Sequence, residues 1–146
     1  MQDRPTAPEL IAAVREFLQN EMLPAIGDQR LRFRTLVASN VLSIVERELA
    51  HEEVLLRDEW ARLVALDDTA AAPAQLPTGL AELRDDVRAR TAALCVAIRA
   101  GAADEGPWRA AVFAHVQRSV AEKLLVNNPK YLDKLKRSQT RDISES

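Results

Sequence analysis

The residues with the clearest potential for chemistry lie in one apolar stretch near the C-terminal end of the chain. Large apolar side chains recur there at spacings of four residues, with Phe113 beside them: Trp108, Val112, Val116, Val120 and Leu124. At about 100° per residue they line one side of a helix, and Ser119 and Lys123 project from the same side. An ammonium facing a core needs a partner or a route to water, so Lys123 is the first candidate for a functional site.

Polar residues also interrupt the apolar side expected for a helix over residues 28–50. Asn40 lies within that side, Arg47 and Glu48 lie near its edges, and His115 borders the stripe that carries Lys123. If the two helices face each other, Glu48 or Asn40 meets Lys123. The predicted ligand-binding cluster therefore comprises Asn40, Arg47, Glu48, His115, Ser119 and Lys123.

Two interpretations of this cluster stay open. In the functional one, facing helices of a bundle form a small-molecule site, in which Lys123 binds an anion while Asn40 and His115 orient it. In the structural one, a half-buried ion pair fixes the register of the helices and the lysine stem reaches outwards. Lys123 also lies within a turn of the helix C-terminus, where a cation is favoured, and this strengthens the structural interpretation.

Other patterns typical of active sites are weak in this sequence. Cys95 has no neighbouring His or Cys and is expected in the apolar core. Glu48 lies three residues before His51, a spacing common by chance in an acidic helix. The four glycines form no phosphate-binding loop. We therefore expect no catalytic residue, no metal and no cofactor.

The composition indicates one soluble domain. The chain has 146 residues, of which 47% are hydrophobic and 29% charged, and only four are glycine. A net charge of −2 argues against nucleic acid, and a basic cluster is expected to be a solvated C-terminal end: Lys130, Lys134, Lys136, Arg137 and Arg141. No apolar run approaches the roughly 20 residues of a membrane span. With no signal peptide and a single cysteine, we expect a cytoplasmic protein without membrane contact.

The pattern of apolar residues and helix breakers predicts an all-α fold, a single-domain antiparallel bundle of about five helices. The expected helices are a first one from the Thr6–Glu9 capping box to Pro24 and Gly27, then 28–50, 52–66, 80–100 and 107–127. Near His51 neither Gly nor Pro occurs, so the second and third helices are alternatively one helix. The bundle is expected to span residues 1–132 and a mobile polar tail residues 133–146. Tyr131 is expected to cover the end of the core, and Trp60 to lie in an interface.

Three segments of the chain resemble a bacterial family of unknown function. They are Arg4–Leu10 with Val14, Phe17 and Leu18; Val37–Leu49; and Glu122–Leu124 with Asn128–Tyr131. The resemblance covers most of residues 3–132. The chain departs from the family at Val126 and Asn127, which replace an expected Ile-Asp and so remove a carboxylate.

The resemblance implies an accessory role in acyl-CoA or small-molecule catabolism. The family occurs alone, or joined to or encoded beside aminoglycoside-phosphotransferase-like kinases and acyl-CoA dehydrogenases, which are the expected partners. It transfers no catalytic residue. The leading hypothesis is a non-catalytic helical accessory domain that binds a partner protein, with a homodimer left open. The alternative is a binding domain for a small anionic ligand, such as an acyl-CoA or a phosphorylated intermediate.

Overall fold

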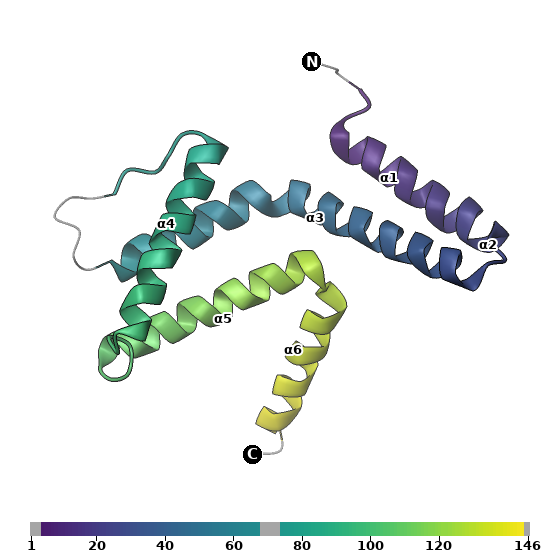
Figure 1. The fold of residues 1–146 in the computed structure, drawn as a ribbon. Coiled ribbons are helices and arrows are strands. Elements are labelled where there is room, and N and C mark those ends of the chain that lie inside the picture. Colours follow the sequence, from purple (N-terminus) through teal and green to yellow (C-terminus); the bar gives the residue numbers. More distant parts are fainter. Residues whose placement is uncertain (1–3, 68–73, 145–146) are drawn as a thin grey trace. The chain divides into compact units, whose positions relative to one another are not determined.

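The computed structural model describes residues 4–67 and 74–144, with only the backbone at residues 136 and 139–144 (Figure 1). All regular structure in this part of the chain is helical, which confirms the all-α fold class. The elements are, in order, α1 (Ala7–Phe17), the π-helical turn η1 (Leu18–Met22), α2 (Leu23–Ala25), α3 (Gln29–Leu66), α4 (Leu80–Arg99), α5 (Pro107–Asn127) and α6 (Pro129–Ser144). None of these described helices is both long and apolar enough to span a membrane. The chain divides into two compact units, Met1–Glu52 and Glu53–Ser146, and each is described by itself.

The first helix begins where the sequence predicts. The amide of Glu9 donates to the Thr6 hydroxyl at 3.4 Å, and the amide of Thr6 donates to the Glu9 carboxylate at 2.6 Å. This capping box satisfies two amides that have no partner in the first turn. The wider turn of η1 directly precedes Pro24, whose ring would clash with a carbonyl in a regular α-helix. The helix therefore reaches Ala25 and ends between Pro24 and Gly27, as predicted.

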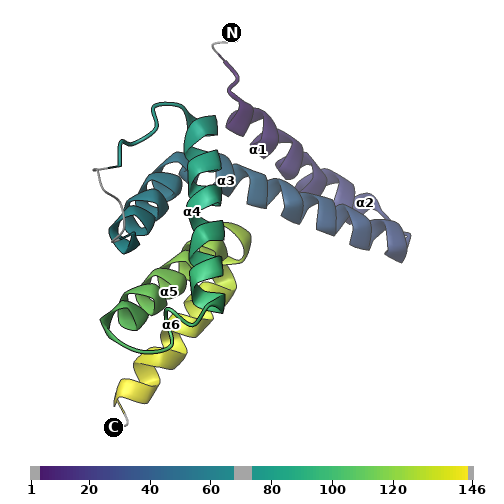
Figure 2. The ribbon, with the colours of Figure 1, turned by 60° about the vertical axis from the view of Figure 1, so that its left-hand side comes forward.

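In the first unit, α1 lies beside the first half of α3 in both ribbon views (Figures 1 and 2). Arg15 of α1 donates to Glu46 of α3 at 2.5 Å, and both side chains are about three-quarters buried. Ser39 lies on the same side of α3 as Glu46 and is only 1% exposed. A small serine leaves little bulk between two helices, so it permits a close approach of the helices at this level.

One uninterrupted helix, α3, replaces the two helices predicted over residues 28–66. The predicted boundary near His51 is wrong, and the alternative of one helix is confirmed. The side chain of Asp28 caps its start by accepting a hydrogen bond from the amide of Leu31 at 2.7 Å. Because no Gly or Pro occurs near His51, nothing in the local sequence stops the helix there.

The core of the second unit lies between the end of α3 and α4. It consists of Trp60 and Leu63 of α3 with Leu83 and Val87 of α4, and Leu83 is only 1% exposed. Trp60 is 8% exposed and donates its indole N–H to Asp86 at 2.6 Å. It is therefore a core residue, and its prediction as an interface residue is wrong.

The turn between α4 and α5 uses two glycines in the left-handed region of the backbone. Gly101 has a φ of +85° and follows the end of α4, where its amide donates to the Ile98 carbonyl at 3.0 Å. Gly106, with a φ of +82°, immediately precedes α5, which begins with Pro107. Glycine adopts such angles without strain, and proline suits the first turn of a helix. The predicted end of α4 and start of α5 are confirmed.

The chain continues as a helix beyond the predicted stop at Asn128. The Asn128 side chain caps α6 by accepting a hydrogen bond from the Tyr131 amide at 3.2 Å. Leu132 is 8% exposed and Tyr131 is 47% exposed, so Leu132 occupies the place expected for the tyrosine. α5 and α6 form a V whose two arms meet between Asn127 and Pro129 (Figure 1). The tail predicted over residues 133–146 is helical as far as Ser144, and its mobility stays a prediction.

The inward side of α5 overlaps only in part with the one predicted: Val112 and Ser119 belong to the predicted side and are buried, whereas His115 and Glu122 lie beside it. Its buried residues are Val112, His115, Ser119 and Glu122. Val116 and Val120 are 43% and 51% exposed, so their prediction as core residues is wrong. Trp108 is half-buried, and Cys95 of α4, expected in the core, is exposed. The polar residues of α5 face inward because α3 supplies them with charged partners.

Candidate functional site

Polar side chains of α3 and α5 in the second unit form a cluster around the carboxylate of Glu122. This residue is 8% exposed. Arg62 of α3 donates from its two Nη atoms to the two Glu122 oxygens, at 3.0 and 2.5 Å. Arg118, one turn earlier in α5, adds a hydrogen bond from Nε at 2.8 Å. Such paired, charge-assisted hydrogen bonds are about twice as strong as neutral ones. We call the set Glu59, Arg62, His115, Ser119 and Glu122, with Arg118 and Lys123 at its edge, the Glu122 cluster.

A second carboxylate of the cluster, Glu59, serves two residues of α5. The hydroxyl of Ser119 donates to its Oε1 atom at 3.3 Å, and the ammonium of Lys123 lies 3.7 Å from the same oxygen. The Lys123 side chain is 66% exposed. The lysine therefore lies at the edge of the cluster, with its ammonium open to water.

His115 is the most enclosed base of the cluster. It is 6% exposed, and its Nδ1 atom has no hydrogen-bond partner among the described residues. Burial lowers the pKa of its imidazole, and the nearby Arg62 guanidinium lowers the pKa further. The neutral form is favoured as a result, because burial disfavours a charged imidazole and the Arg62 guanidinium repels it.

The geometry of the Glu122 cluster is that of an ion-pair network between two helices. Three cationic side chains, Arg62, Arg118 and Lys123, face two carboxylates. The Ser119 hydroxyl donates to Glu59, the carboxylate that Lys123 shares, so Glu59 links α3 to two residues of α5. Both oxygens of Glu122 are occupied by guanidinium groups. The arrangement accounts for the joining of α3 to α5 and supports the structural interpretation of Lys123.

The predicted site residues fall into two groups. His115, Ser119 and Lys123 lie on α5 in the second unit, and the structure brings all three to the Glu122 cluster. Asn40, Arg47 and Glu48 lie on α3 within the first unit. There Asn40 and Glu48 are exposed and Arg47 is half-buried. The approach of this second group to Lys123 stays a prediction.

Four residues of the cluster were missed by sequence reasoning: Glu59, Arg62 and Glu122, and Arg118 at its edge. A signal for the first three exists in their spacing. Glu59 and Arg62 are three residues apart on α3, and Ser119 and Glu122 are three apart on α5, so each pair lies on one side of its helix. That match becomes informative only once the two helices are known to be neighbours.

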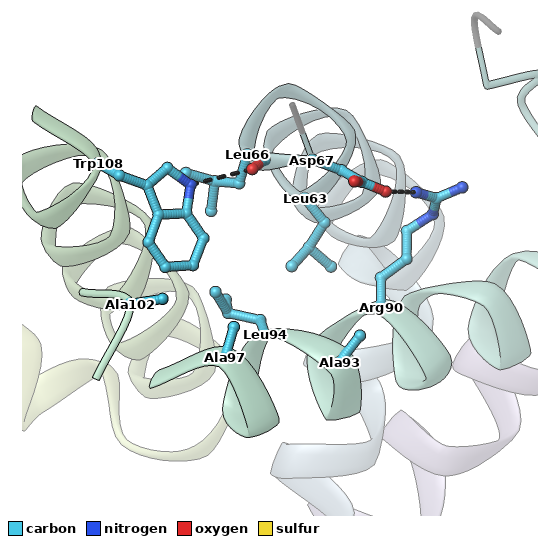
Figure 3. Close-up of a pocket in the computed structure, with 9 residues that line it drawn as sticks. All are labelled: Leu63, Leu66, Asp67, Arg90, Ala93, Leu94, Ala97, Ala102 and Trp108. Carbon is cyan, nitrogen blue, oxygen red and sulfur yellow. Dashed lines mark hydrogen bonds and ion pairs between the residues drawn. The ribbon is translucent and has the colours of Figure 1, made fainter. Parts of the chain in front are cut away.

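A pocket of about 600 Å³ lies between the end of α3, α4 and the start of α5, all within the second unit (Figure 3). Its walls are mostly apolar, and its lining residues are Leu63, Leu66, Asp67, Arg90, Ala93, Leu94, Ala97, Ala102 and Trp108. The indole N–H of Trp108 donates to the Leu66 carbonyl at 3.0 Å, which fixes the ring as one wall. A volume of this size is typical of small-molecule sites.

The charged end of the pocket is formed by Arg90 and Asp67, which Figure 3 shows opposite Trp108. Arg90 donates from Nε to Asp86 at 2.9 Å, and its guanidinium lies 5.8 Å from the centre of the Trp60 ring. The hydrogen bond from Arg90 lowers the pKa of the Asp86 carboxyl, and the Trp60 indole adds to this, while partial burial acts in the opposite direction. Asp86 is therefore ionised, and its carboxylate holds Arg90 in place.

Metal ligands are not grouped in the described part of the chain. No set of three or more His, Cys, Asp or Glu side chains there is placed to hold a metal ion. The second unit offers a ligand two features, the Glu122 cluster and the pocket beside Trp108.

This geometry defines the class of protein: a helical domain that contains a buried ion-pair cluster and an apolar pocket. The chain belongs to the family described as a domain of unknown function, DUF6285, which matches residues 24–131. The resemblance to a family of unknown function is thereby confirmed for the segments within that range, whereas residues 4–18 lie outside it. No curated protein and no solved structure matches the chain.

Proposed function

We propose that the chain is a non-catalytic helical interaction domain, and that its first unit binds a second copy of the chain through α3. The observation that carries this proposal is a set of apolar side chains exposed along that helix. Phe33, Leu36, Val37 and Val41 are 65%, 54%, 45% and 50% exposed. Monomeric soluble proteins rarely leave contiguous apolar patches of more than a few hundred Å² in water.

The neighbouring helix adds to this apolar surface. Leu10, Val14 and Phe17 of α1 share one side of their helix and are each about half exposed. The apolar residues of two such helical hairpins, buried against each other, would give a four-helix arrangement with a common core. Burial of each large apolar side chain contributes about 1.5–3 kcal/mol, which favours association.

The spacing on α3 favours a second copy over an unrelated helix. Phe33, Val37, Asn40 and Ile44 follow one another at intervals of four, three and four residues, the repeat with which two helices pack side by side. A single asparagine within such a repeat is best satisfied by an identical asparagine, whose amide both donates and accepts. Asn40 thus marks the centre of a symmetric pair.

The charges flanking Asn40 are complementary when the two helices run antiparallel. Arg30 and Arg34 lie ten and six residues before Asn40, and Glu48 lies eight residues after it. All three are exposed. An antiparallel pair centred on Asn40 therefore places the Glu48 of each copy between the two arginines of the other. A parallel pair would set like charges opposite each other.

The mass of the protein in solution tests this proposal. Light scattering at micromolar concentrations should give twice the chain mass of 16.2 kDa. Val37→Glu, which buries a charge in the apolar face, should return the monomer. Phe113→Glu, at an apolar residue of α5 that is 63% exposed, should leave the dimer intact. A monomer at all concentrations, or a dimer dissociated only by Phe113→Glu, would refute binding through α3.

We propose further that the assembled domain binds a phosphotransferase-like kinase or an acyl-CoA dehydrogenase as an accessory subunit. The support for these partners is the resemblance to a family joined to or encoded beside such enzymes. Co-purification of the tagged chain with a neighbouring phosphotransferase tests it. If the enzyme binds the wild type but not Val37→Glu, and the wild type alone is monomeric, the enzyme rather than a second copy covers α3.

Binding of a small anionic ligand is the second candidate function. The observation that favours it is the pocket beside Trp108, not the exposed ammonium of Lys123. A Lys123→Met change that abolishes ligand-induced thermal stabilisation, without altering the unliganded melting temperature, would instead place the anion at Lys123.

A further inference from the structure

The pocket beside Trp108 has the shape of a site for an elongated, mostly apolar molecule. Figure 3 shows leucines of α3 above the pocket and Ala93 and Ala97 of α4 below it, with Trp108 at one end. The alanines leave space that larger side chains would fill. Because Trp108 is hydrogen-bonded to Leu66, the pocket is largely pre-formed and a ligand does not need to order its wall.

At the opposite end, Arg90 presents hydrogen-bond donors in a fixed position. Its Nε atom is committed to Asp86, and the Trp60 ring lies beside the guanidinium. Among the described residues, its Nη1 atom comes only within ion-pair distance of Asp67, at 3.6 Å, beyond the length of a hydrogen bond. The Nη edge can therefore donate to a planar acceptor, and a carboxylate fits two parallel N–H groups.

Asp67 is the group that such an acceptor would replace. It follows the last residue of α3, where unpaired carbonyls make a carboxylate unfavourable. Its side chain is 40% exposed, so water can reach the carboxylate when Arg90 turns to another acceptor. The exchange leaves the charge facing Arg90 unchanged, because one carboxylate replaces another.

From these features we infer that the pocket binds a small amphipathic carboxylate. The apolar body lies between α3 and α4, the far end contacts Trp108, and the carboxylate accepts hydrogen bonds from the Nη atoms of Arg90. An ammonium-headed amphiphile, which would pair with Asp67 instead, is the rival that the test must separate. This site is independent of the α3 surface proposed for association.

Calorimetric titration of the full-length protein with octanoate, octanol and octylammonium compares three head groups attached to the same eight-carbon tail. Octanoate should bind about tenfold more tightly than octanol, the gain expected for a charge-assisted hydrogen bond. Octylammonium should bind no better than octanol. Equal affinities, tighter binding of octylammonium, or no binding of octanoate at millimolar concentrations would each overturn the inference.

Two alanine variants of α4 test the location. Ala97→Leu fills the pocket and should abolish octanoate binding, whereas Ala92→Leu, at an exposed position outside the pocket, should leave it unchanged. Both should retain the melting temperature of the wild type. Octanoate binding that survives Ala97→Leu would place the ligand elsewhere and refute the site.

Two changes at the charged end act in opposite directions. Arg90→Gln should reduce octanoate affinity to that of octanol. Since Arg90 also contacts Asp86 and Trp60, this variant is expected to lose stability as well, and Asp67→Asn provides the independent measurement. Removal of the competing carboxylate should tighten octanoate binding severalfold and leave octanol unchanged. Weaker octanoate binding by Asp67→Asn would contradict the exchange at Arg90.

Discussion

Arg62 of α3 and Glu122 of α5, sixty residues apart in the chain, form a two-point ion pair that is mostly closed to solvent. The Glu122 side chain is 9% exposed and that of Arg62 is 24% exposed. Because both Nη atoms meet both carboxylate oxygens, the pair fixes the rotation of α5 as well as its distance from α3. This explains why a polar side of α5 faces inward while Val116 and Val120 remain exposed.

Removal of one partner of this pair should destabilise the second unit strongly. Glu122→Ala leaves a largely buried guanidinium without its counter-ion, and we expect a loss of about 3 kcal/mol in the free energy of unfolding. Chemical denaturation measures it. The control Glu105→Ala, at an exposed residue, should change stability by less than about 0.5 kcal/mol.

The double variant Arg62→Met with Glu122→Leu tests whether the ion pair stabilises the fold or only fixes how α5 packs on α3. Two apolar residues of similar volume should recover most of the stability lost by Glu122→Ala, because no buried charge is left unpaired. The Arg118 side chain, which also loses its partner, is 62% exposed and reaches water. A double variant no more stable than Glu122→Ala would show that the attraction between Arg62 and Glu122 exceeds the free-energy cost of burying their charges.

The apolar core of the second unit should respond to a cavity at its centre. Leu83 is 1% exposed, and Leu83→Ala is expected to lower the free energy of unfolding by about 3 kcal/mol through lost burial and the void left behind. Val96→Ala, on an exposed side of the same helix at 63% exposure, is the matched control. Similar effects of the two changes in thermal denaturation would place the core elsewhere.

Acid should weaken the fold through His115. Its lowered pKa means that, just below the unfolded pKa of about 6.5, the unfolded chain binds a proton that the folded chain does not. Stability therefore falls as the pH decreases from about 6.5 towards the folded pKa. Besides burial, Arg62 and Lys123 lower that pKa, while Glu59 and Glu122 oppose them.

The glutamine variants of the two histidines isolate this contribution in denaturant titrations at several pH values. His115→Gln should flatten the loss of stability between neutral and mildly acidic pH. His51→Gln, at an exposed position, should retain it. A wild-type slope in His115→Gln would assign the acid sensitivity to other groups.

Asn40 should set the register of the two helices in the proposed dimer, although it makes the dimer less stable than an apolar residue would. Asn40→Leu is expected to tighten association, because a leucine adds buried apolar surface, but also to admit other registers or larger oligomers. Sedimentation equilibrium reports both effects. Ala38→Leu, off the apolar side of α3, should leave the dissociation constant unchanged. Weaker association of Asn40→Leu would contradict a position for Asn40 between two copies.

Much of the fold is predictable because several helix ends are determined by residues next to them in the sequence. Thr6 with Glu9, Gly101 and Pro107 each mark a boundary that the structure confirms. The false boundary at His51 arose from an apparent change of pattern, without any residue that stops a helix. Asn128 both follows α5 and caps α6, so a breaker motif also signalled a new helix that was overlooked.

The candidate site was predictable only in part, because its determinants are tertiary. His115 and Ser119 were identified as polar residues near an apolar stripe, but Val116 and Val120 of that stripe are exposed. The side of α5 that is buried depends on Arg62 and Glu59, whose positions no local pattern reveals. The pocket depends likewise on alanines, which look ordinary in a helix-rich sequence.

Distances between spin labels on two copies of α3 test the central proposal most directly. In a Cys95→Ser background, cysteines replace Ala38 or Ala50, both exposed. An antiparallel pair centred on Asn40 sets the two labels about 6 Å apart along the helix axis at position 38 and about 30 Å apart at position 50. We predict a short distance for the first and a long one for the second. Equal distances at the two positions, or no dipolar coupling between copies, would contradict the antiparallel dimer.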